Sequence, residues 1–338
     1  MNMVDKKDYR ISIIRMISML MIVACHILQG LNNKWAFWVN VGVQVFFFIS
    51  GFLYGQKKIK DTKSFYIRRW KKVCIPYYII FLLMLLLERI ILKKYYPFHQ
   101  ILGCFLGFGA FTGSIVTLSH TWFVTYVMLC YLLVPVLQNI FKSQKFKTNF
   151  IRFLLLTALV HAFQIYGLIN IETSWINNFI IGYFYSKCYK DSKQEKKLEI
   201  FILTMFFLII PFSIIYQENL PIALPNLLNS RANSIINYGH VLLGSLLFIS
   251  LYEILSMLKL KENRILTFSD KYSYEIYLVH QIFILNSFSV LFLTKSLAIN
   301  IILILLLSVL SAIILKKVSD FFIALIERIF SKLTGTMI

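Results

Sequence analysis

The 338-residue chain is 59% hydrophobic and 16% aromatic, and its mean hydropathy is +0.72. Soluble domains are about half apolar, so this composition excludes an ordinary soluble fold and indicates a polytopic membrane protein. A net charge of +20 would suggest nucleic acid as the partner of a soluble protein. Here the basic residues lie between apolar segments, where they set membrane topology, so we expect no nucleic-acid partner.

Ten apolar segments, separated by basic or polar stretches, are predicted as membrane-spanning helices. With this assignment 28 of the 35 Lys and Arg residues fall on one side, five on the other and two within helices. The positive-inside rule then places both termini in the cytoplasm. The expected fold is an all-α membrane bundle that forms one domain over residues 1–315, followed by a basic amphipathic cytoplasmic tail at 316–338. The predicted helices are 11–30, 35–55, 73–93, 122–140, 153–168, 175–185, 198–216, 234–257, 272–293 and 297–315.

The first apolar segment contains two ionisable residues, Arg15 and His26. They are eleven residues apart, so on one helix they share a face and differ in depth by about 16 Å. Because burying such groups in a membrane is costly, they suggest a functional site. Two alternatives stay open: Arg15 could extend to the cytoplasmic headgroups, and His26 could form a neutral interhelical hydrogen bond. The sequence before Cys25 loosely resembles a lipoprotein cleavage site, but Arg15 interrupts the apolar run that such a signal needs.

The connections that follow differ in charge. Residues 57–72 hold eight basic residues and one acid, Asp61, and are predicted as a cytoplasmic loop. Residues 95–120 are apolar but rich in Gly, Ser and Thr, and are predicted as an outer loop, with a re-entrant form left open. Glu88 and Arg89, just before this loop, could pair with each other. The five cysteines have no metal-binding or disulfide spacing, so we expect no metal site.

Few polar residues interrupt the predicted helices, and on physical grounds alone they form no catalytic motif. The sequence has no Ser/His/Asp order, no glycine-rich phosphate loop and no metal-ligand spacing. Histidine is nevertheless the side chain best suited to move a proton near neutral pH. Tyr277 and His280 are spaced i, i+3 and share a helix face that could meet the cavity beside His26. An interhelical hydrogen bond is the structural alternative for His280.

Five stretches together resemble the acyltransferase-3 family of bacterial integral-membrane O-acyltransferases, from about residue 8 to residue 315. They occur in the order of the family: the Arg15 to His26 spacing, GVQVFFFISGF at 42–52, a basic run ahead of IPY at 75–77, HTWF at 120–123 and SYEIYLVH at 273–280.

This resemblance implies a ten-helix enzyme of the bacterial plasma membrane, with acetyl-CoA or a similar acyl-CoA as donor on the cytoplasmic side and an extracytoplasmic carbohydrate acceptor. It implies catalytic roles for His26 and Arg15. The paired arginines of the family match Arg69 and Lys72. Because lysine lacks the bidentate fork of arginine, the neighbours Arg68 and Lys71 are further candidates for donor binding. The side chains expected to line the cavity or contact the acceptor are Gln44, Ser50, Glu88, His120, Trp122, Tyr277 and His280.

The resulting hypothesis is an O-acetyltransferase that modifies a surface polysaccharide, of a capsule or cell wall, or its lipid-linked precursor. His26 would take a proton from the attacking sugar hydroxyl, and an acyl-histidine intermediate is the competing mechanism. The partners expected are acyl-CoA, the carbohydrate acceptor and membrane lipids. The alternative from another functional class is a polysaccharide or lipid exporter, in which Arg15, His26 and Glu88 line a translocation path.

Overall fold

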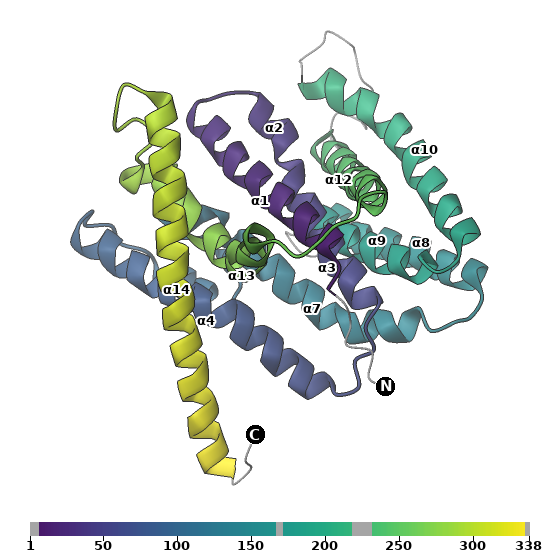
Figure 1. The fold of residues 1–338 in the computed structure, drawn as a ribbon, viewed down its shortest axis with the longest axis horizontal. Helices are drawn as coiled ribbons and strands as arrows, with labels where there is room; N and C mark the ends of the chain where they lie inside the picture. The colour runs from purple at the N-terminus through teal and green to yellow at the C-terminus, as the bar shows by residue number, and fades with distance from the viewer. Residues whose placement is uncertain (1–6, 167–171, 218–231, 335–338) are drawn as a thin grey trace. The chain divides into compact units, whose positions relative to one another are not determined.

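The structure, a computed structural model, describes residues 7–166, 172–217 and 232–334, and all regular structure in these residues is helical (Figure 1). The chain divides into two compact units, and four helices contribute to both: α1 (Tyr9–Gly30), α2 (Trp35–Val39), α7 (Trp122–Ile140) and α13 (Arg264–Val279). Unit 1 comprises Met1–Ile22, Phe37–Lys60 and Leu132–Thr267, and unit 2 comprises Val23–Ala36, Asp61–Tyr131 and Phe268–Ile338.

Seven of the described helical segments are long and apolar enough to cross a membrane, which confirms a polytopic helical membrane protein. Each of the three other predicted segments also contains a helix: α9 (Ser174–Cys188), α10 (Ser192–Gln217) and α13. The seven candidate spans are Tyr9–Gly30, Trp35–Gly55, Thr62–Ile90, Val116–Ile140, Phe146–Gln164, Ser234–Ser256 and Leu297–Ser331.

Unit 1 is organised around the contact between α3 (Val41–Gly55) and α9. A Cβ atom on Gly51 would lie 2.0 Å from the Phe179 carbonyl oxygen, and one on Gly182 would lie 2.2 Å from that of Phe48. Small residues on both helices therefore bring the two backbones together, as is common in membrane helix packing. The helix α12 (Ala232–Ser256) packs on both, while α8 (Phe146–Ile165) packs on α9, and α2 (Trp35–Val39) precedes α3.

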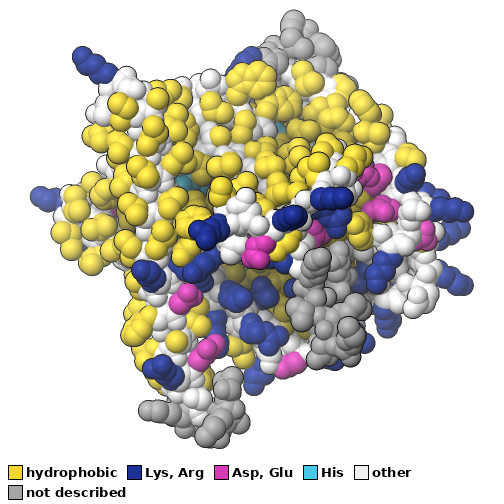
Figure 2. Space-filling model, in the orientation of Figure 1, with side chains coloured by type: hydrophobic (Ala, Val, Ile, Leu, Met, Phe, Trp, Pro, Cys, Tyr) yellow, Lys and Arg dark blue, Asp and Glu magenta, His cyan; other side chains and the backbone are white. Residues whose placement is uncertain are grey.

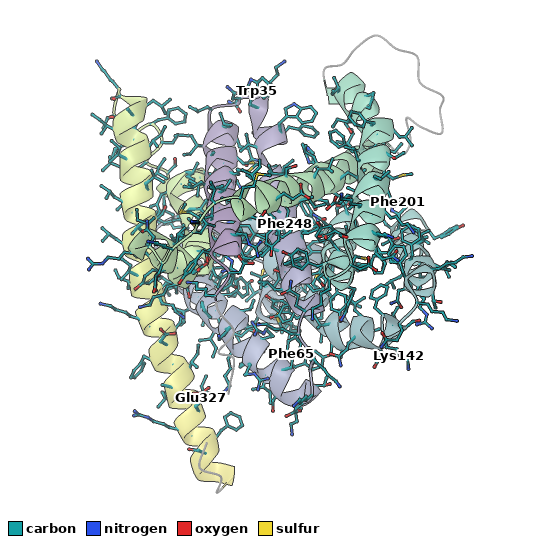
Figure 3. All side chains as sticks on the ribbon, turned by 45° about the vertical axis from the view of Figure 1, so that its right-hand side comes forward. Trp35, Phe65, Lys142, Phe201, Phe248 and Glu327 are labelled. Carbon is teal, nitrogen blue, oxygen red and sulfur yellow. The ribbon has the colours of Figure 1, made fainter. Side chains whose placement is uncertain are left out.

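In unit 2 the long helices are α4 (Thr62–Ile90) and α14 (Leu297–Thr334), which pack against each other (Figure 1). The prediction of a loop over 57–72 is wrong from Thr62 onward. Asp61 accepts hydrogen bonds from the backbone N–H groups of Lys63 and Ser64, and this N-cap starts the helix within the basic run. Figure 3 shows Phe65 and Glu327 at one end of unit 2 and Trp35 at the other.

The helix α14 continues for 38 residues, across the boundary that the sequence predicts at residue 315. Its first part exposes apolar side chains such as Ile302, Leu306 and Leu310. Figure 2 shows hydrophobic side chains over this part and charged ones farther along the helix. The division into a membrane domain and a tail stays a prediction, but no break in the helix accompanies it.

The stretch predicted as an outer loop at 95–120 folds into three short helices: α5 (Phe98–Phe105), α6 (Gly109–Thr112) and the 3-10 helix η1 (Val116–Thr121). Gly113, at φ +88°, makes the turn between the last two in a backbone conformation that side chains disfavour. Its position on the outer side of the membrane stays a prediction.

The predicted helix over 272–293 is wrong in its second half. The α-helix ends at Val279 and is followed by two 3-10 helices, η2 (His280–Phe283) and η3 (Asn286–Phe288). The His280 ring donates to the carbonyl oxygens of Ile276 and Tyr277, which would otherwise accept backbone hydrogen bonds from the next helical turn. Asn286, at φ +70°, then reverses the chain in the left-handed region that asparagine tolerates.

Candidate active site

Three imidazole rings lie together within unit 2. His26 comes from α1, His120 from η1 and His280 from the start of η2. Their ring centroids are 4.9 Å apart for His26 and His280, 5.3 Å for His120 and His280, and 6.0 Å for His26 and His120. His120 and His280 are buried, whereas His26 is only half-buried. His26 is therefore the least buried residue of the cluster.

The hydrogen bonds of His280 determine its tautomer. Its Nδ1 lies 2.8 Å from the Tyr277 carbonyl oxygen, and since a carbonyl can only accept, Nδ1 must carry a proton. In the neutral ring Nε2 is then an acceptor, and it lies 2.7 Å from His26 Nδ1. His26 therefore donates from Nδ1, so its Nε2 carries the lone pair. That nitrogen has no hydrogen-bond partner among the described residues.

His120 is oriented by the same carbonyl. Its Nε2 lies 2.9 Å from the Tyr277 oxygen and donates to it, which leaves Nδ1 as the acceptor nitrogen. In the described part of the chain this buried Nδ1 has no hydrogen-bond partner. An unsatisfied buried acceptor typically costs about 1–3 kcal/mol, so it favours a ligand that donates a hydrogen bond there.

Side chains from α13 and η2 hold the segment that carries His120. Tyr277 donates its hydroxyl to the His120 carbonyl oxygen. The Gln281 amide oxygen accepts from the His120 backbone N–H at 2.9 Å, and its amide nitrogen donates to Ser119 Oγ at 3.1 Å. Side chains of α13 and η2 therefore hold η1 in place through hydrogen bonds to its backbone and to one of its side chains.

Glu88 fixes η1 from the other side. Its buried carboxylate accepts from the Thr117 backbone N–H at 2.9 Å, from the Thr117 hydroxyl and from the Tyr96 hydroxyl. The pairing of Glu88 with Arg89 that the sequence suggested is wrong, because adjacent helical side chains point about 100° apart. Arg89 lies instead over the ring of Tyr95, 3.2 Å from its centroid.

The basic residues predicted to bind the donor lie on the first turns of α4. Arg68 and Lys72 are exposed, while Arg69 is half-buried near the rings of Phe65 and Tyr131. Lys71 forms an ion pair with Glu327 of α14 at 2.8 Å, so part of its charge is already compensated. Tyr77, eight residues after Arg69, donates to the Cys104 carbonyl oxygen.

Four other predicted residues lie elsewhere. Trp122 begins α7 in unit 2, where its ring contacts those of Phe123 and Tyr126. Arg15 lies on α1, and Gln44 and Ser50 on α3, all within unit 1. Asn178 of α9 donates to both the backbone and the side-chain oxygen of Gln44, at 2.7 and 2.9 Å, which makes Gln44 part of the helix packing.

Sequence analysis missed Gln281, Thr117 and Tyr96, which hold the cluster in place. Gln281 is a polar residue directly after His280 inside an otherwise apolar run, and this is a signal that could have found it. Thr117 and Tyr96 lie in a stretch predicted as a loop and have no comparable signal.

A family comparison identifies the chemistry. The family model of an acyltransferase domain matches residues 8–317, which is most of the chain. The chain belongs to the acyltransferase-3 family. No curated protein and no solved structure matches it. It is thus a multi-pass membrane acyltransferase, and its reaction needs an acyl donor and an acceptor.

The histidine cluster has the chemistry that an acyltransferase needs. An imidazole with an accessible lone pair can remove a proton from an attacking hydroxyl or attack the acyl carbon itself. In the described residues no carboxylate is hydrogen-bonded to any of the three rings. A second imidazole and a backbone carbonyl therefore occupy the positions that a carboxylate takes in a Ser/His/Asp triad.

Proposed function

We propose that this acyltransferase transfers acetyl from acetyl-CoA to a hydroxyl of a cell-surface polysaccharide, or of its lipid-linked precursor, in the bacterial plasma membrane. The observation that supports it most is the lone pair on His26 Nε2, whose position follows from the chain of hydrogen bonds through His280 to the Tyr277 carbonyl. His26 acts as the general base.

In the proposed reaction the acceptor oxygen attacks the thioester carbonyl carbon while His26 Nε2 removes the hydroxyl proton. The C–O bond forms and the C–S bond breaks, giving an ester and the CoA thiolate. The proton on His26 passes to the departing sulfur, which regenerates the neutral ring. No metal takes part in this scheme.

His280 is a positioning residue in this scheme. It accepts the Nδ1 proton of His26 at 2.7 Å, which fixes the tautomer and the direction in which Nε2 points. When His26 becomes an imidazolium ion, the same hydrogen bond becomes charge-assisted and stabilises it. His120 Nδ1 would accept a hydrogen bond from a neighbouring hydroxyl of the acceptor, which would satisfy that buried nitrogen.

The beginning of α4 is the proposed donor site. The four basic residues at 68, 69, 71 and 72 attract the phosphates of CoA. From Arg69 to Tyr77 the helix α4 rises about 12 Å. Within this stretch the Val73 carbonyl oxygen accepts a hydrogen bond from Tyr274 of α13, the helix that also carries Tyr277. The pantetheine arm would follow this path toward the histidines.

The decisive experiment compares surface glycan from cells with and without the gene by proton NMR. Loss of O-acetyl methyl signals on deletion, restored by the wild-type gene, supports the proposal. An exporter would instead change the amount of surface glycan and leave its ester content per repeat unchanged. Acid quenching of purified enzyme with radiolabelled acetyl-CoA separates the two mechanisms, because only an acyl-histidine intermediate leaves label on the protein.

A further inference from the structure

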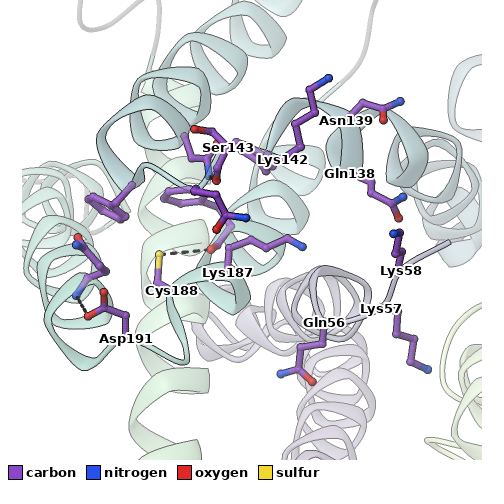
Figure 4. Close-up of a pocket in the computed structure, with 16 residues that line it drawn as sticks. Gln56, Lys57, Lys58, Gln138, Asn139, Lys142, Ser143, Lys187, Cys188 and Asp191 are labelled. Atoms are coloured by element: carbon purple, nitrogen blue, oxygen red, sulfur yellow. Dashed lines mark hydrogen bonds between the residues drawn. The ribbon is translucent and has the colours of Figure 1, made fainter.

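Unit 1 contains a cavity of about 650 Å³ that the proposed reaction does not use. It lies between the end of α3, the end of α7, the start of α8 and the junction of α9 with α10. Four lysines line it: Lys57, Lys58, Lys142 and Lys187. Figure 4 shows Lys187 extending from α9 toward Gln138 and Lys58.

Within the described residues none of these four lysines forms an ion pair, and the lining holds four lysines against one acidic residue. Asp191 is the acidic residue of the lining, and its carboxylate accepts the backbone N–H groups of Lys193 and Gln194 at the start of α10. Several like charges around one cavity favour binding of an anion.

Two buried acceptors complete the cavity. The Asn149 amide donates to the Ser143 carbonyl oxygen at 2.8 Å, which leaves Oδ1 without a partner, and Gln194 Oε1 also has none in the described chain. Both residues line the cavity. An anion that also carries hydroxyl donors would satisfy these two oxygens.

A second hollow, of about 570 Å³, adjoins the first and shares Asn139 and Lys142 with it. Apart from these two residues and Arg152, its lining is aliphatic: Val136, Ile140, Leu155, Leu156 and Leu159. It lies between α7 and α8, both of which are candidate membrane spans, and Leu155 and Leu159 are exposed. A groove of this kind suits a hydrocarbon chain.

We propose that the two hollows form one site for an acidic phospholipid with a hydroxylated headgroup, such as phosphatidylglycerol. The phosphate would lie among the lysines, the headgroup hydroxyls would donate to Asn149 and Gln194, and an acyl chain would lie along the aliphatic groove. Basic pockets between membrane helices on the cytoplasmic side characteristically bind acidic lipid headgroups. The lysines come from the predicted connections 56–72, 141–152 and 186–197, which the helix boundaries and the cytoplasmic N-terminus expected from the sequence all place in the cytoplasm.

Native mass spectrometry of the full-length protein in neutral detergent tests the site, with phosphatidylglycerol and phosphatidylcholine titrated separately. We expect one phosphatidylglycerol to be retained at concentrations where phosphatidylcholine is not. The double substitution Lys58→Gln with Lys187→Gln should weaken retention by about tenfold or more. Phosphatidylglycerol with six-carbon chains should also bind more weakly, because it cannot fill the groove.

The matched control is Lys147→Gln with Lys190→Gln, which removes two exposed lysines outside the lining, one on the first turn of α8 and one between α9 and α10. This variant should retain the lipid as the wild type does. Equal binding of both lipids, equal weakening by the control, or full binding of the short-chain lipid would overturn the proposal. Stoichiometric displacement of the lipid by CoA would assign the cavity to a nucleotide instead.

Discussion

His26 and His280 have the same side chain but opposite functions in their shared hydrogen bond. His26 donates from Nδ1 and keeps its lone pair on Nε2, which has no hydrogen-bond partner in the described residues, whereas the lone pair of His280 is occupied by His26. The consequence is that only one of the two can serve as base. Their substitutions should therefore differ in effect.

Replacing His26 by Gln keeps bulk and hydrogen-bonding capacity but removes the ability to take up a proton. His26→Gln should insert and bind acyl-CoA as the wild type does, while its transfer rate falls by about 10² to 10⁴. Glycan O-acetylation and donor affinity, measured on the same preparation, check this. Near-normal acetylation by a folded His26→Gln variant would show that the histidine is structural.

Replacing His280 by Ala removes the acceptor that orients His26. Transfer should fall by about 10- to 100-fold, less than for His26→Ala, since one hydrogen bond to a charged ring is lost and the base remains. His280→Gln should recover part of the rate, because its amide oxygen can accept from His26 Nδ1. If His280→Ala acetylates as well as the wild type, or if Gln is no better than Ala, the positioning role is wrong.

Among the elements, α4 combines two tasks along its length. Its first turns carry the basic residues, and Glu88 near its end fixes η1, which carries His120. Both tasks depend on the helix starting at Thr62, within the run predicted as a loop. Asp61 is a residue type that favours a helix N-cap, and the positive charge of the run does not by itself distinguish a basic loop from the start of a basic helix.

The double substitution Arg69→Ala with Lys72→Ala should weaken acyl-CoA binding by about tenfold or more while the protein still assembles, because charge-assisted phosphate contacts are lost at the end of a helix. Binding to purified protein, measured by isothermal calorimetry, checks this. Lys60→Ala with Lys63→Ala, two exposed lysines at the same helix start, is the control and should bind normally. Unchanged affinity in the first variant would mean that the run only sets topology.

The positions of most helices were predictable from hydropathy and charge, and α7 begins and ends at the predicted residues, Trp122 and Ile140. The end of α13 was not. No Gly or Pro marks the break after Val279, where the His280 ring lies within hydrogen-bond distance of two helix carbonyls. The sequence predicts that the helix face of Tyr277 and His280 could meet the cavity beside His26, but the arrival of His120 at this cluster depends on the folding of 95–120 into short helices.

On the scale of the whole molecule, three basic connections that are distant in sequence line one cavity of unit 1, and the sequence predicts all three as cytoplasmic. The contact that supports this unit, between α3 and α9, depends on glycines instead of charge. The periodicity of the sequence does not identify either glycine, because the close approach of the two backbones depends on both helices.

Gly182→Leu should destabilise the protein, because its Cβ alone would lie 2.2 Å from the Phe48 carbonyl oxygen and the helices would have to separate. Overpacking of this kind typically costs about 1–3 kcal/mol, so the midpoint of thermal unfolding should fall by several degrees. Gly109→Ala, whose Cβ would lie 3.4 Å from Cys104 Sγ, is the control. Equal unfolding midpoints for Gly182→Leu and the wild type would contradict the close packing.

One oxygen atom orients two of the three imidazoles, and it belongs to the main chain at Tyr277. No side-chain substitution removes it, so a mutational scan that identifies His26 would pass over the atom on which its proton arrangement depends. Replacing the peptide bond between Tyr277 and Leu278 with an ester, which weakens that carbonyl as an acceptor, would reach it through backbone chemistry. Side-chain mutations can replace each of the three rings, whereas the backbone conformation at Tyr277 sets the position of the carbonyl oxygen that orients two of them.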